Sequence, residues 1–339
     1  MTVSLSDKNR FSTLGHSFGT PLRGIWLQEG GCGLANRIPK KTISLYLLLT
    51  LALSAVVWTL IIWSGHLNMG FGLVIPAIMW CPALAALLTC RLLGREFRSL
   101  AWRWPDNRYI AAAYFVPLAY ASVAYGAVWG LHLAGWNSDF VTSVALALGL
   151  NALPAWVSFT LCILFMATGG IIQNLSMTLG EEIGWRGLLV PELLKYMSFT
   201  KASLVSGFVW AVWHSPLLLF ADYNAGTNRL YAFVCSAITC ISISFILAWF
   251  RLKSDSLWPP ALLHASHNLF VPIIFDNLTR NTGPTLWYTT VFGAALAITT
   301  SLFAFYFWAR RTEVQERVGG SVQAAAFAEV RTAQSGGLY

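Results

Sequence analysis

G-E-E-I-G-W-R-G, residues 180–187, places two adjacent glutamates and an arginine at the end of a long apolar run. Each ionisable residue at membrane depth costs about 2.5–3.5 kcal/mol on insertion scales. Three such residues within six positions therefore indicate that the protein uses them, either to hold its helices together or for chemistry.

The sequence around this stretch has the composition of a polytopic membrane protein. Of its 339 residues, 56% are hydrophobic and only 11% are charged, whereas soluble domains carry about 25% charged residues. The first apolar run is too long for the core of a signal peptide, so we interpret it as an uncleaved span. We predict an all-α helical bundle with eight transmembrane helices, at about 42–64, 71–93, 109–133, 155–179, 202–220, 230–250, 257–275 and 285–308.

Three regions follow from this assignment. Residues 1–41 form a polar, basic N-terminal tail, 42–308 form the membrane domain, and 309–339 form a polar C-terminal tail. The stretch 141–153 is too short to span a membrane and is expected to be a re-entrant or interfacial helix. A separate amphipathic helix is expected at 188–199, after the glutamates.

The net charge of +8 would also fit a nucleic-acid-binding protein, but its distribution does not. With the N-terminus inside, all of the 22 basic residues except Arg229 and Arg280 fall in cytoplasmic segments, as the positive-inside rule requires. We therefore exclude a nucleic-acid partner and predict that both termini are cytoplasmic. The glutamates then lie at the cytoplasmic end of their span.

The first polar cluster is the glutamate pair itself. On a helix, Glu182 and Arg186 are four positions apart and share one face, with the glutamate in the favoured N-terminal position. Glu181 is rotated by about 100° from its neighbour, so we expect it to have no partner in its own helix. This arrangement predicts a structural Glu182 and an uncommitted Glu181, although a salt-bridge cluster at a helix end remains an alternative.

Two further clusters lie in later apolar runs. His214 follows Trp210 by one helical turn, and His264 precedes Asn268 by one turn. Histidines in such runs also serve as hydrogen-bonded packing residues or as polar contacts between helices. His267 lies near the same face as His264, and we interpret it as a packing or supporting residue.

Together the clusters contain the parts needed for hydrolysis. A carboxylate, two imidazoles and an amide can activate water and stabilise an oxyanion. Two alternatives from other classes remain. One is a proton-coupled transporter that uses Glu181, Glu182 and His214 as a relay, and the other is an inactive scaffold that binds membrane proteins.

The ordered motifs E-E-x-x-x-R, aromatic-x-x-x-H and H-x-x-x-N resemble those of the CPBP intramembrane proteases, also called the ABI family. This family includes type II CAAX prenyl proteases and bacterial relatives linked to bacteriocin processing. The resemblance covers about residues 155–275 and implies an endopeptidase acting on a membrane-bound or lipidated protein or peptide. It implies the following roles: Glu181 and His214 activate water, His264 and Asn268 form the oxyanion hole, and Glu182, Arg186 and Trp210 support the site.

One residue departs from the family pattern. The second motif usually begins with Phe, and here it begins with Trp210. The aromatic character is retained, so we expect activity to persist with a different cleft shape. The resemblance also implies an integral protein of the cytoplasmic (inner) membrane of a bacterium, surrounded by the lipid bilayer.

The sequence favours hydrolysis without a metal cofactor. It contains no H-E-x-x-H motif, and none of its six cysteines forms a C-x-x-C pair. Zinc held by Glu181, His214 and His264 is the alternative.

Overall fold

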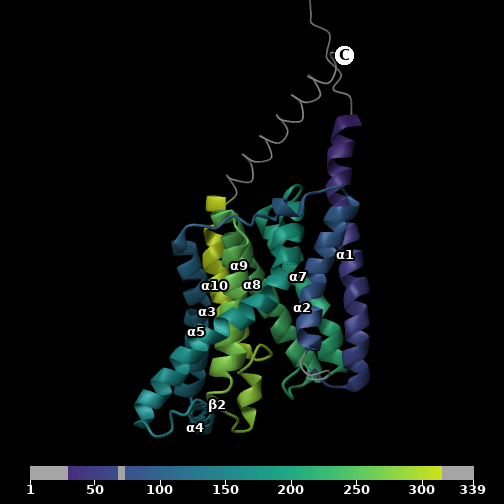
Figure 1. Ribbon diagram of the computed structural model, residues 1–339. Helices are drawn as coiled ribbons and strands as arrows, with labels where there is room; N and C mark the ends of the chain where they lie inside the picture. Colours follow the sequence, from purple (N-terminus) through teal and green to yellow (C-terminus); the bar gives the residue numbers. More distant parts are fainter. Residues whose placement is uncertain (1–29, 68–72, 315–339) are drawn as a thin grey trace, which may run out of the picture.

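A computed structural model describes residues 30–67 and 73–314, so most of the two expected tails lies outside the described residues. The described part is a helical bundle with one short strand pair (Figure 1). η2 and η5 are 3₁₀ turns, and η3 and η4 are π-helical. In chain order the elements are α1 (Gly30–Ser64), α2 (Val74–Leu92), η2 (Phe97–Leu100), α3 (Asn107–Gly130), β1 (Gly135–Trp136), α4 (Ser138–Ala147), α5 (Ala155–Glu182), η3 (Ile183–Leu189), α6 (Val190–Leu194), α7 (Phe199–Phe220), α8 (Arg229–Ser254), α9 (Trp258–Asn268), η4 (Leu269–Phe275), β2 (Thr279–Arg280), η5 (Pro284–Trp287) and α10 (Ala294–Ala309).

The predicted all-α membrane bundle is confirmed. Within the described residues, six helical stretches are long and apolar enough to cross a membrane. They are Lys40–Ser64, Val74–Leu92, Asn107–Gly130, Ala155–Leu194, Phe199–Phe220 and Arg229–Ser254.

The count of eight spans is not confirmed. The seventh expected span is divided into α9 and the π-helical η4. The eighth begins with the short turn η5 and resumes as α10, whose 16 residues make it a shorter apolar helix. The expected non-spanning stretch at 141–153 covers the C-terminal part of the ten-residue α4 and the turn that follows it.

The helices that carry the polar clusters pack together in the middle of the bundle. α5 contacts α2 and α9, while α7 contacts α8, which in turn contacts α9 and α10. In Figure 1, α1 and α2 lie side by side at one edge, and α5 runs at a tilt through the bundle. Residues far apart in the sequence are thereby brought to the region where α5 ends.

The helix that carries the glutamates is longer than expected. α5, η3 and α6 form one continuous stretch, Ala155–Leu194, so the separate helix expected at 188–199 is wrong. We expected a separate helix near the interface because residues 188–199 are amphipathic and charged. The structure instead buries the charges at 181–186 among other helices, where their partners replace water.

Two glycines allow this helix to approach α2 closely. A Cβ added to Gly180 would lie 2.7 Å from the backbone oxygen of Met79, and one added to Gly184 would lie 2.6 Å from Cβ of Pro82. Gly184 also faces the hydroxyl of Tyr46 in α1. Small residues four positions apart are a common means of close helix contact in membranes.

Gly184→Ala is expected to lower the free energy of unfolding by about 1–3 kcal/mol, because the added methyl group overpacks this contact. Gly169→Ala on the same helix is the control, since nothing lies within 4 Å of its added Cβ. Unfolding of the purified proteins in detergent measures the difference. Equal stability of the two variants would contradict the close approach.

A half-buried carboxyl joins three segments at the end of the bundle that carries β1 and β2. Asp276, just after η4, accepts hydrogen bonds from the hydroxyl of Tyr125 on α3 and from the backbone N–H of Thr290, the latter at 3.1 Å. Burial raises the pKa of Asp276 to about 6, against the opposing effect of these hydrogen bonds. The pairing of Gly135 with Arg280 closes the same end of the bundle.

Asp276 predicts a pH-dependent stability. Because the folded-state pKa is raised above 3.8, the protonated folded form is favoured at low pH, and stability falls as pH rises from about 4 to about 6. A shift of roughly two pKa units corresponds to about 3 kcal/mol. Asp276→Asn should remove this component while still accepting both hydrogen bonds. Unfolding curves in detergent between pH 4 and pH 7 measure the free energy of unfolding of both proteins. The same dependence of this free energy on pH in wild type and Asp276→Asn would contradict the prediction.

Candidate active site

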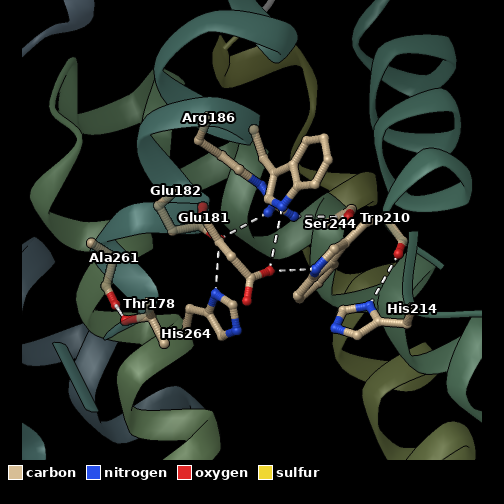
Figure 2. Close-up of polar contacts among 10 residues, drawn as sticks. Thr178, Glu181, Glu182, Arg186, Trp210, His214, Ser244, Ala261 and His264 are labelled. Carbon is tan, nitrogen blue, oxygen red and sulfur yellow. Dashed lines mark hydrogen bonds and ion pairs between the residues drawn. The ribbon is translucent and has the colours of Figure 1, made fainter. Parts of the chain in front are cut away.

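The three sequence motifs meet in one region of the structure. The first motif is at the junction of α5 and η3, the second is on α7, and the third is on α9. Figure 2 shows Glu181 and Glu182 above, with His264 on one side and His214 on the other. The side chain of Trp210 lies between the two histidines.

Glu182 is the centre of a buried ion network. Its Oε1 atom accepts from Nη1 of Arg186 at 2.9 Å and from Nδ1 of His264 at 2.9 Å. Arg186 also donates to the hydroxyl of Ser244 on α8 at 2.8 Å. Glu182 and Arg186 are both 0% exposed. The expected Glu182–Arg186 pair is present, and it additionally holds His264.

Glu181 is less free than the sequence suggests. We expected no partner in its own helix, but its Oε2 accepts from the indole N–H of Trp185 at 3.4 Å. It also accepts from the indole N–H of Trp210 at 2.7 Å. The expectation was wrong because the indole N–H of Trp185 is also a donor. The spacing of four between Glu181 and Trp185 was a usable signal for the first contact.

The hydrogen bonds of the two histidines fix the roles of their ring nitrogens. Nδ1 of His214 lies 3.0 Å from the backbone oxygen of Trp210, and a carbonyl can only accept, so this nitrogen carries the proton. Nδ1 of His264 likewise donates to the Glu182 carboxylate. In Figure 2 the second ring nitrogens of both histidines point towards each other, below the Glu181 carboxylate. Among the described residues, no direct hydrogen bond joins Glu181 to His214.

The remaining residues of the third motif differ in their placement. Asn268 ends α9, one turn after His264, and its side chain is half-buried. It shares the helix with His264, but in the described part of the chain no hydrogen bond joins it to Glu181. His267 is buried and pairs through Nδ1 with the hydroxyl of Tyr120 at 2.8 Å, away from the two glutamates.

The described residues do not assemble a metal-ligand set. Among the side chains that the structure describes, no three from His, Cys, Asp or Glu lie close enough together to hold a metal ion. Glu181, His214 and His264 therefore do not fit a zinc site in this arrangement. Hydrolysis without a metal stays a prediction.

Other contacts around the site were not anticipated. The hydroxyl of Thr178 donates to the backbone oxygen of Ala261 at 3.2 Å and ties α5 to α9 (Figure 2). Arg251 donates through Nε to the backbone oxygen of Arg186 at 3.1 Å, within the π-helical turn. These contacts hold α8, α9 and the continuous stretch of α5 and η3 together around the two glutamates.

Comparison with known proteins agrees with the motifs. Residues 156–270 match the family model described as type II CAAX prenyl endopeptidase Rce1-like. Over 77 residues, the chain is 29% identical to CAAX prenyl protease 2 of Methanococcus maripaludis. That match covers 22% of this chain and 28% of the relative, so the shared part is a little over a quarter of that protein. The resemblance to CPBP proteases is confirmed, and all three motifs lie within the residues matched by the family model.

Proposed function

We propose that this chain is an intramembrane endopeptidase, since its residues 156–270 match the Rce1-like family model of type II CAAX prenyl endopeptidases. Its substrate would be a membrane-associated or lipidated protein or peptide, in the cytoplasmic membrane of a bacterium. The observation that carries the proposal is the convergence of Glu181, His214 and His264 from three separate helices. A purely structural ion pair would require only Glu182 and Arg186.

The attacking water would be held by two acceptors. Oε2 of Glu181 is occupied by indole donors, which leaves Oε1 to accept a proton from water. Nε2 of His214 carries no proton in the neutral ring, because Nδ1 holds it. It can therefore accept the second hydrogen of the same water. Such general-base assistance typically contributes 10²–10⁴-fold in rate.

The oxyanion would be stabilised from the opposite side. Nε2 of His264 can donate only when the ring carries both protons, and Glu182 is placed to stabilise that imidazolium at 2.9 Å. The amide of Asn268, one turn further along α9, would supply the second donor. Arg186 pairs with the same Glu182 oxygen at 2.9 Å and balances its negative charge.

Hydrolysis would then proceed in two steps. The water oxygen adds to the peptide carbonyl while Glu181 takes the proton, and negative charge develops on the carbonyl oxygen. The tetrahedral intermediate collapses with cleavage of the C–N bond, and Glu181 returns the proton to the leaving amine. The products are a new carboxylic acid and a new amine, and transfer of a proton between them gives a carboxylate and an ammonium group.

The proposal is tested with purified protein in lipid vesicles. Wild type and Glu181→Gln are each co-reconstituted with membrane proteins extracted from cells that lack this chain, and new C-termini are identified by mass spectrometry. A farnesylated peptide ending in a C-A-A-X sequence is the second probe. We expect cleavage of at least one probe by the wild type only. Wild-type vesicles that cleave neither probe but take up a solute under a pH gradient would contradict the proposal.

A further inference from the structure

Trp210 contacts four other residues of the site. It is 4% exposed, and its indole N–H donates to Glu181 at 2.7 Å. Its backbone oxygen accepts from His214 at 3.0 Å. Its ring lies beneath the Arg186 guanidinium, 4.9 Å from centroid to Cζ, and meets the His264 ring edge-on at 5.0 Å. One residue of α7 therefore joins side chains from α5, η3 and α9 (Figure 2).

The indole N–H has a role that a purely apolar ring cannot fill. An indole nitrogen can only donate, and a carboxylate can only accept, so the bond fixes one oxygen of Glu181. The contact at 2.7 Å is at the short end of the normal range, whereas that from Trp185, at 3.4 Å, lies beyond it. Trp210 is thus the principal donor, and Trp185 gives weaker support.

Fixing one oxygen also decides where the other one points. With Oε2 held by Trp210, the carboxylate of Glu181 cannot rotate freely, and Oε1 is directed to the space that the Nε2 atoms of His214 and His264 face (Figure 2). A base that is held in the productive orientation avoids reorganisation during the reaction.

We propose that Trp210 is a positioning residue whose indole N–H orients Glu181 for proton abstraction from water. This inference rests on the proposed function and adds a residue that acts through the base without contacting the substrate's reacting atoms. A tryptophan that only fills space would show no dependence on its N–H group.

The test compares Trp210→Phe with Trp213→Phe. Phenylalanine keeps an aromatic ring and the backbone carbonyl that holds His214, but it removes the N–H. Trp213 is the matched control, because it is equally buried, one turn away, and contacts the His214 ring, while its N–H donates to Ser54 instead. With the probe peptide that the wild type cleaves, Trp210→Phe should lower kcat about 10- to 100-fold with little change in KM, as expected for a misplaced catalytic group. Trp213→Phe should change kcat only a few-fold.

A second readout does not depend on cleavage. The infrared carboxylate band that is absent in Glu181→Gln should shift in Trp210→Phe and stay in place in Trp213→Phe. An unshifted band, an unchanged kcat, or equal losses in the two tryptophan variants would each overturn the positioning role. A wild type that cleaves no probe would instead contradict the proposed function, so the two failures are distinguishable.

Discussion

Glu181→Gln is expected to reduce kcat by about 10²–10⁴-fold while the protein still folds and inserts. Glutamine is isosteric, and its side-chain oxygen can still accept from the indole N–H of Trp210. It cannot take a proton from water. KM for the cleaved peptide should stay close to the wild-type value, because Glu181 is not expected to contribute to ground-state binding.

Glu192→Gln is the control for this experiment. Glu192 is also a buried carboxylate, but it pairs with Arg95 and Lys195, each at 2.7 Å, outside the site. Its replacement should leave kcat within a few-fold of wild type. Full activity of Glu181→Gln, or equal losses in both variants, would show that Glu181 is not the base.

Glu182→Gln is expected to lower both stability and activity. It leaves the Arg186 guanidinium, 0% exposed, without its ion-pair partner, and removing one partner of a buried pair costs about 3–5 kcal/mol. It also removes the charge that stabilises the His264 imidazolium, and loss of one oxyanion donor costs about 10²–10³-fold in kcat. Unfolding in detergent and the cleavage rate in vesicles measure the two effects.

A double variant separates these effects. Glu182→Gln combined with Arg186→Met removes both charges, so much of the stability should return, whereas activity should remain low because His264 still lacks its carboxylate. Recovery of activity together with stability would mean that Glu182 acts only as a structural partner of Arg186.

The local part of the site could be predicted from the sequence. Glu182 and Arg186 are four positions apart on one helix, and helix geometry alone brings them together. The order of the three motifs also indicated the family. Composition and the length of the apolar runs were sufficient for the helical membrane fold.

The contacts between helices could not be predicted in this way. The bonds from Trp210 to Glu181 and from His264 to Glu182 join residues 29 and 82 positions apart. Their geometry depends on how α7 and α9 pack against α5. The continuity of Ala155–Leu194 was missed for the same reason, since burial of the charges is a property of the assembled bundle.

The most direct test of the central claim is a high-resolution experimental density map of the site. The account predicts an ordered water within about 2.6–3.2 Å of both Oε1 of Glu181 and Nε2 of His214, the reach expected of a general base. A metal ion bound by Glu181, His214 and His264 would contradict it, as would a site in which these side chains face apart.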